Sequence, residues 1–216
     1  MMKAFTEEMD NIQAAILSNE FQDGIGDPCS CGGSDKANFR CEEDCFETAP
    51  LQCQQCIINL HTRLPFHCIQ EWTGEYFKRT SLHDLGARIF LGHSGMPCPN
   101  RSSAYTGRPF VIVDRNGFHK FTLEFCHCDN LKDVLQTEPI QLIRARLFPA
   151  TLDQPETAFT FRLLDDFHAH TLSSKKSSYV FHDALQKRTE AAFPQDVPVS
   201  YFLHYFTCKH FILTKP

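Results

Sequence analysis

Eight cysteine and histidine side chains occur as four closely spaced pairs in the first third of the chain. The pairs are Cys29-x-Cys31, Cys41-x3-Cys45, Cys53-x2-Cys56 and His61-x5-His67. Short spacings let one tight turn direct two side chains at the same ion, and zinc prefers four nitrogen or sulfur ligands in a tetrahedron. We therefore expect about the first 70 residues to fold around two zinc ions rather than around a large apolar core.

Four pairs can build two sites in two ways, because either neighbouring or alternating pairs can share an ion. We favour the alternating arrangement, which four-pair modules of the B-box and ZZ type commonly adopt, although spacing alone leaves both open. Site 1 would then comprise Cys29, Cys31, Cys53 and Cys56. Site 2 would comprise Cys41, Cys45, His61 and His67. Buried thiols without metal are the alternative, but this polar stretch offers little apolar material for another kind of core.

The compartment decides between metal binding and disulfides. The N-terminal sequence MMKAFTEEMDNIQAAIL lacks the basic start and apolar block of a secretory signal. No apolar run approaches the roughly 18 residues of a membrane span. We expect a reducing, nuclear location, where clustered cysteines bind metal more often than they form disulfides. The odd number of cysteines, 11, also fits a pure disulfide framework poorly.

A third metal site is predicted further along the chain. Its four ligands would be His93, Cys98, Cys126 and Cys128. The alternative is that Cys98 is a packed thiol and His93 a surface residue, and rival nitrogen ligands are available at His83, His119 and His127. We expect two to three zinc ions in all. The remaining cysteines, Cys68 and Cys208, are expected to be ordinary packed thiols.

The pattern of turns and apolar residues predicts an α+β chain. We expect a small zinc-stabilised cross-brace module, then a β-hairpin carrying the Cys-x-Cys site, then C-terminal helices. The expected segments are an N-terminal helix region (1–22), a two-zinc module (23–80), a loop and hairpin region (81–155), a helical region (156–193) and a divergent tail (194–216).

Individual elements can be placed within these segments. Helices are predicted at residues 6–20, which should lean on the zinc region, at Ile69–Arg79, from Ser81 onward, at Thr157–Leu172 and at Ser178–Ala192. Residues 110–125 are the clearest β signal, with Asn116-Gly117 as the two-residue turn of a hairpin. Residues 139–150 fit either a strand or a short helix that Pro149 ends.

Charge is unevenly distributed. The net charge is −5, but residues 1–50 carry 3 basic and 11 acidic side chains, whereas residues 171–216 carry 6 basic and 3 acidic. A protein that gripped DNA with its whole surface would be basic, so any DNA contact must be local. The candidate cations are Arg101, Arg108, Arg115, Lys120, Arg144 and Arg146, for which simple solvation is the alternative reading.

Catalytic motifs are missing from the sequence. It contains no HExxH, no zinc-deaminase signature, no GxxxxGK[ST] and no GxSxG. Each proposed site is filled by four protein ligands, whereas a catalytic zinc keeps a position open for water. Asp165-Asp166 is better explained as a solvated helix face. We therefore expect a protein that is not an enzyme.

An ordered series of motifs resembles the cysteine-cluster domain of fungal KDZ transposases. The series begins with His61-x3-Pro65-Phe66-His67-x4-Trp72-x-Gly74-x2-Phe77, Leu85-Gly86, Leu91-Gly92-His93 and Cys98-Pro99. It continues with Asp114-x-Asn116-Gly117-x-His119, Phe125-Cys126-x-Cys128, Gln141-Leu142-x-Arg144, Phe148-Pro149-Ala150-Thr151 and Thr157-Ala158-Phe159-Thr160-Phe161. The sequence departs from the family at Leu147, where an aromatic residue is usual, and after about Pro194.

The resemblance implies a zinc-binding accessory region that precedes a transposase catalytic domain and binds DNA or a chromatin partner. The family's zinc ligands fall on the cysteines and histidines named above. No catalytic domain follows in this sequence, so we expect a fragment or a stand-alone derivative. The alternatives are a protein-interaction module of the B-box or ZZ type and, less favoured, a ubiquitin ligase.

Overall fold

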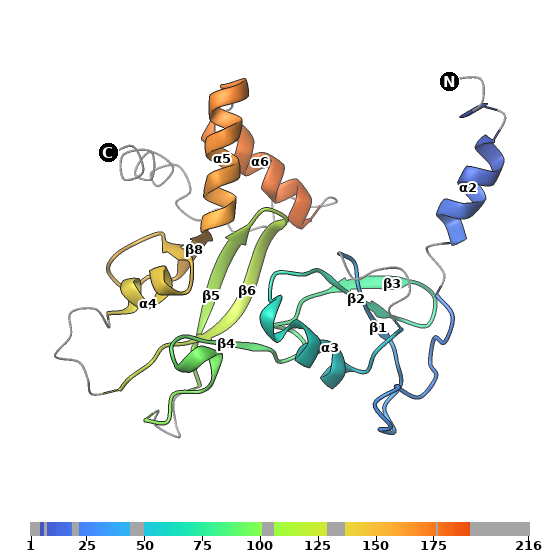
Figure 1. Ribbon diagram of the computed structural model, residues 1–216, viewed down its shortest axis with the longest axis horizontal. Helices are drawn as coiled ribbons and strands as arrows, with labels where there is room; N and C mark the ends of the chain where they lie inside the picture. Colours follow the sequence, from blue (N-terminus) through green and yellow to red (C-terminus); the bar gives the residue numbers. More distant parts are fainter. Residues whose placement is uncertain are drawn as a thin grey trace. The chain divides into compact units, whose positions relative to one another are not determined.

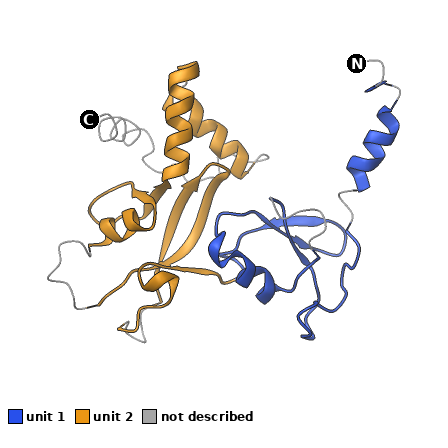
Figure 2. Cartoon of the chain, viewed as in Figure 1, with its two compact units in different colours: residues 1–85 blue, residues 86–216 orange. Residues whose placement is uncertain are grey.

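The computed structural model describes residues 5–6, 8–18, 22–43, 50–100, 106–128, 137–175 and 177–190. These residues form helices and two separate sheets, joined by loops (Figure 1), so the expected mixed α+β class is confirmed. The chain divides into two compact units, residues 1–85 and residues 86–216 (Figure 2). None of the helices in the described residues is both long and apolar enough to cross a membrane.

Unit 1 is built on a small antiparallel sheet with the strand order β1-β2-β3. Its register places Cys41, the last residue of β1, opposite Ile69, the first residue of β2. The candidate ligand Cys41 is thereby fixed by main-chain pairing. The elements of unit 1 are α2 (Met9–Ser18), β1 (Phe39–Cys41), α3 (Gln54–Leu60), the 3-10 turn η1 (His61–Arg63), β2 (Ile69–Trp72) and β3 (Phe77–Thr80).

One hydrophobic cluster of unit 1 is small and contains candidate metal ligands. Its buried members are Cys29, Ala37, Leu51 and Cys53, and the partly buried Ile25, Cys56 and Phe77 pack against it. Three of these seven residues are cysteines predicted to bind metal. In this cluster the candidate metal ligands are therefore part of the packed core.

The helix predicted at Ile69–Arg79 is wrong, because these residues form the hairpin of β2 and β3. Trp72 pairs with Phe77 across the hairpin, and their rings meet edge to face at 5.1 Å. Trp72 and Tyr76, which are four residues apart, also suit one face of a helix, which explains the error. Gly74, with φ 109°, supplies the left-handed backbone that the turn requires.

The helix predicted from Ser81 onward is also wrong, although its capping contacts form. The backbone N–H of Asp84 donates to Oγ of Ser81 at 3.0 Å, and that hydroxyl donates to Asp84 Oδ2 at 2.6 Å. Gly86 follows with φ 90°, so the chain leaves the helical conformation after a single turn.

At the N-terminus, a helix (α2) does lie within residues 6–20. None of its residues is buried, so the expected packing on the zinc region is not seen.

Unit 2 contains a mixed five-stranded sheet with the order β4-β6-β5-β8-β7. The central hairpin of β5 and β6 is antiparallel, whereas β4 runs parallel to β6 and β8 parallel to β5. Unit 2 comprises β4 (Arg88–Phe90), the 3-10 turn η2 (His93–Gly95), β5 (Arg108–Asp114), β6 (Gly117–Glu124), α4 (Glu138–Arg144), β7 (Leu147–Pro149), β8 (Thr157–Thr160), α5 (Phe161–Ser174) and α6 (Ser178–Thr189).

The hydrophobic core of unit 2 joins the central sheet to the last two helices. Its buried residues are Val113, Phe118, Ala150, Phe159, Leu163, Leu164, Phe181 and Leu185. Phe167 on α5 meets Phe181 on α6 edge to face at 5.1 Å, which pairs the two helices seen together in Figure 1. Unit 2 thus has an apolar core that contains none of the candidate metal ligands.

The predicted hairpin is present, but its turn is displaced by one residue. Asp114 pairs with Gly117, so the two-residue loop is Arg115-Asn116 and Gly117 opens β6. A Cβ atom at Gly117 would lie 2.4 Å from Oγ1 of Thr189 on α6. The glycine is therefore explained by the close approach of α6, whose Thr189 hydroxyl also accepts a hydrogen bond from the Phe118 backbone at 2.8 Å.

The helix predicted at Thr157–Leu172 begins later than expected. Thr157–Thr160 forms the buried strand β8, and α5 starts at Phe161. Thr160 caps this helix, because its hydroxyl accepts a hydrogen bond from the Leu163 N–H at 3.2 Å. The ambiguous segment 139–150 holds both alternatives, since α4 is followed directly by β7. The last predicted helix is observed as α6, and residues 191–216 lie outside the described residues.

The buried carboxylate of Asp114, at the end of β5, forms an ion pair with Arg162, whose side chain is about half exposed. That carboxylate, only 1% exposed, accepts hydrogen bonds from the Arg162 guanidinium and the Thr160 hydroxyl. Burial alone would raise the pKa of Asp114, but these donors outweigh it and hold the pKa below its usual value. The pair joins β5 to the start of α5.

We predict that Asp114→Asn destabilises unit 2 by about 3 kcal/mol, because it leaves buried polar groups poorly matched. The matched control is Asp166→Asn, which removes a carboxylate 3.5 Å from Arg115 at a site where both side chains are about half exposed. That change should cost less than about 1 kcal/mol. Amide hydrogen exchange in β5, β6 and β8 measures both effects, and equal protection in the two variants would contradict the prediction.

Candidate metal centres

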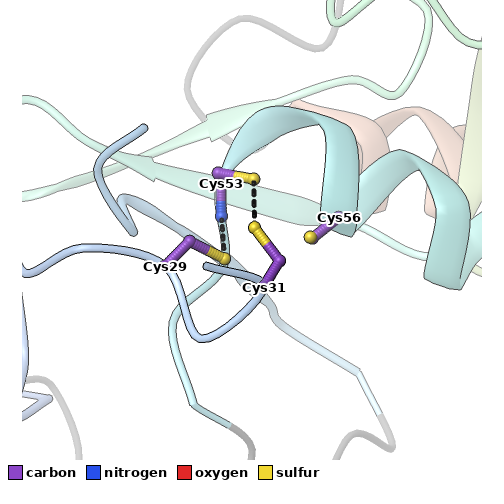
Figure 3. A group of neighbouring side chains, drawn as sticks. All are labelled: Cys29, Cys31, Cys53 and Cys56. Atoms are coloured by element: carbon purple, nitrogen blue, oxygen red, sulfur yellow. Dashed lines mark hydrogen bonds between the residues drawn. The ribbon is translucent and has the colours of Figure 1, made fainter. Parts of the chain in front are cut away.

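The first cluster joins four cysteines from two segments that are distant in sequence. Cys29 and Cys31 come from a loop, whereas Cys53 precedes α3 and Cys56 lies in its first turn (Figure 3). The four sulfur atoms lie within 4.8 Å of one another, and those of Cys31 and Cys53 are 4.0 Å apart. A tetrahedral zinc–thiolate site requires sulfur atoms about 3.8 Å apart. The cluster therefore fits a zinc ion.

Backbone hydrogen bonds prepare the first cluster for thiolate formation. The N–H of Cys53 donates to the sulfur of Cys29 at 3.3 Å. Backbone hydrogen bonds from Cys31 and Cys53 lower the pKa of Cys29 to about 6. The pKa of Cys56 is raised to about 12, because its thiol faces the sulfur atoms of Cys53 and Cys31. A bound cation would stabilise all four cysteines as thiolates, which is the form in which cysteine binds metal.

The second cluster joins Cys41, at the end of β1, to His61 and His67. The sulfur of Cys41 lies 3.3 Å from Nδ1 of His67. Nδ1 of His61 lies 2.8 Å from the carbonyl oxygen of Ile57, which leaves Nε2 for a metal. Burial lowers the pKa of His61, so its imidazole stays neutral, as a metal ligand must be. The fourth predicted ligand, Cys45, lies outside the described residues.

The third cluster joins His93, Cys98, Cys126 and Cys128. Nε2 of His93 lies 3.1 Å from the sulfur of Cys126 and 3.3 Å from that of Cys128. The sulfur of Cys98 lies 3.9 Å from that of Cys126 and 3.6 Å from that of Cys128. All four ligand atoms again fall within 4.8 Å of one another, which fits a single tetrahedral ion.

Strand pairing brings the ligands of the third cluster together. Because β4 and β6 run parallel, their C-terminal ends lie side by side, and the ladder continues through the N–H of Leu91 to the carbonyl of Glu124 at 2.8 Å. His93 follows the first strand and Cys126 the second. Gly92 permits the approach, since a Cβ there would lie 3.1 Å from the Cβ of Cys126. His93, which the sequence predicted as a ligand, directly follows this glycine.

The thiols of the third cluster differ in acidity. Burial alone would raise the pKa of Cys98, but hydrogen bonds from the backbone of His127 and Asn100 lower it to about 6. The pKa of Cys128 is raised to about 11, first by burial and then by the neighbouring thiol of Cys98. As in the first cluster, thiols this close ionise together only beside a cation.

The structure therefore brings together the first and third predicted pairs, and likewise Cys41 with the fourth pair. Of the rival nitrogen ligands, His83 lies beside Asp84 and His119 beside Asn116, and His127 belongs to none of the three clusters. Cys68 lies 3.0 Å from Nη2 of Arg79, and burial raises its pKa to about 12. Cys208 lies outside the described residues.

The candidate DNA-binding cations differ in availability. Arg108 is already bound to other residues of unit 2, because it pairs with Glu138 at 2.6 Å and donates to the carbonyl of Pro155 at 2.8 Å. Arg115 lies 3.5 Å from Asp166. Arg101 is outside the described residues. Lys120, Arg144 and Arg146 are exposed, and the guanidinium of Arg146 lies 5.2 Å from the centre of the Phe161 ring.

Most of the described part of unit 2 matches a known protein family. Residues 82–192 match the family model of the CxC2-like cysteine cluster associated with KDZ transposases. The chain belongs to this family. The match covers just over half of the sequence. It includes the third cluster, of which Cys126-x-Cys128 supplies the last two ligands. No curated protein and no solved structure matches the chain.

Membership of the CxC2 family identifies the chain as a cysteine-rich, transposase-associated module. The family is an accessory cysteine cluster and not the catalytic domain of the transposase. The matched segment begins at residue 82, so the first two clusters lie ahead of it. Likeness of these clusters to a B-box or ZZ module stays a prediction.

We predict that the purified protein contains three zinc ions, one for each cluster. Cys126→Ser should remove one ion and Cys53→Ser at least one, because a hydroxyl is a far weaker zinc ligand than a thiolate. Cys68→Ser is the matched control and should leave the content at three. Elemental analysis of the intact protein measures this. An unchanged content in Cys126→Ser would exclude the third site.

Proposed function

We propose that this CxC2-family chain is a zinc-binding recognition module of a KDZ-type transposable-element protein and has no catalytic role of its own. The main support is the composition of the clusters: the described members of all three are cysteines and histidines without a carboxylate. A zinc ion held by four such ligands has no open position for water. Zinc would then act by fixing loops in place, which suits a surface that binds another macromolecule in the nucleus.

DNA is the partner that we propose for unit 2. Residues 86–216 carry 15 basic and 12 acidic side chains, whereas residues 1–85 carry 6 basic and 14 acidic. Contacts to phosphate depend on local positive charge, which unit 2 offers and unit 1 does not. Arg144 and Arg146 are exposed at the C-terminal end of α4 and can reach a DNA backbone.

We predict that Arg144→Gln with Arg146→Gln weakens binding to DNA from the ends of a KDZ element. The slope of log affinity against log salt should fall by about 2, since two phosphate contacts are lost. The control is Lys36→Gln with Lys78→Gln, which removes the same charge from exposed positions of unit 1. Gel shifts at several salt concentrations measure this. Absence of binding by the wild-type protein at low salt would contradict a DNA role.

A basic protein segment is the second candidate partner, and the charge of unit 1 favours it. A cluster of four thiolates with one Zn²⁺ adds a further net negative charge to this acidic unit. A basic peptide such as a histone tail would therefore be attracted to it. Binding of histone-tail peptides without binding of DNA would favour this candidate over the first.

A further inference from the structure

A buried glutamine on α4 is bound to the backbone of a candidate metal ligand. The side chain of Gln141 is only 8% exposed. Its Oε1 accepts a hydrogen bond from the backbone N–H of Cys126 at 2.8 Å, and its Nε2 donates to the carbonyl oxygen of Cys126 at 3.1 Å. Both main-chain polar groups of Cys126 are thus held by one amide.

The amide of Gln141 bonds to the Cys126 backbone as a neighbouring strand would, at a point where the sheet has ended. The strand β6 ends at Glu124, so Cys126 has left the regular ladder. On the side of β4, Gly92 packs against the Cβ of Cys126. The amide of Gln141 satisfies the backbone of Cys126, whose N–H and C=O would otherwise be costly to bury unpaired.

The helix that carries Gln141 is itself anchored. Leu142, the next residue of α4, is fully buried, and Glu138 in its first turn pairs with Arg108 of β5 at 2.6 Å. The amide therefore projects from an element that is fixed to the sheet by both apolar and ionic contacts. Positioning groups on such elements hold their partners more precisely than groups on loops.

The position of the Cys126 backbone determines where its sulfur lies. That sulfur is 3.1 Å from Nε2 of His93 and 3.9 Å from the sulfur of Cys98. Zinc–sulfur bonds are about 2.3 Å long, so a small rotation of the backbone would take the sulfur out of bonding range. Groups that orient metal ligands typically contribute about 10- to 100-fold to metal affinity.

We propose that Gln141 is a positioning residue for the third cluster, and that its amide holds the backbone of Cys126 so that the four ligand atoms meet around one ion. The proposal rests on the proposed binding of zinc by this cluster. It assigns to α4 the role of coupling the metal centre to the sheet of unit 2.

The test uses the full-length protein and two variants of the glutamine. Gln141→Leu removes both hydrogen bonds at similar volume, and Gln141→Asn keeps the amide but shortens its reach. The control is Leu185→Ala on α6, which weakens the core of unit 2 at a residue that belongs neither to α4 nor to the third cluster. Zinc release to a colorimetric chelator is timed well below the unfolding temperature, and cobalt(II) absorption reports the geometry of the ligands.

We expect both Gln141 variants to release one of the ions about 10- to 100-fold faster than the wild-type protein, with an altered cobalt spectrum. Leu185→Ala should lower thermal stability but leave both the release rate and the spectrum unchanged. Release at the wild-type rate in both Gln141 variants would overturn the proposal, as would equal acceleration in Leu185→Ala. If Cys126→Ser removes no ion from the wild-type count, the proposed metal site itself fails.

Discussion

Thiol groups crowded within 4.8 Å of one another cannot all ionise unless a cation lies between them. In each four-membered cluster one thiol has its pKa lowered to about 6, while another has its pKa raised to about 12 or about 11. Without a cation, the neighbouring thiols cannot all take the ionised form that binds metal. A divalent ion bound by all four ligands removes their mutual repulsion. The loops that carry these ligands depend on this one interaction for their arrangement.

The two units depend on the clusters to different degrees. In unit 1, one hydrophobic cluster includes the candidate ligands Cys29 and Cys53, so the metal site and part of the core coincide. Unit 2 has a core of strands and helices that stands apart from its ligands, including Phe159 and Leu163. The third cluster is attached to this core through the parallel ends of β4 and β6. Loss of metal should therefore disturb a loop in unit 2 but the fold itself in unit 1.

Much of the candidate site follows from spacing, because a metal demands nearby ligands and short spacings provide them. Neighbouring and alternating pairs could not be told apart in this way, since that choice is made by the pairing of β1 with β2. The hairpin of β2 and β3 was mistaken for a helix, because Trp72 and Tyr76 also suit helical spacing. The role proposed for Gln141 could not be predicted, since it depends on a contact between residues 15 positions apart.

The most direct test of zinc-dependent folding uses Trp72, the only tryptophan, which lies in the hairpin of unit 1. Its fluorescence is followed while a strong chelator removes the metal, and amide exchange follows the core of unit 2 in parallel. We predict that emission shifts to longer wavelength as unit 1 unfolds, while Phe159 and Leu163 stay protected. Complete removal of metal without any change in the emission of Trp72 would contradict the account.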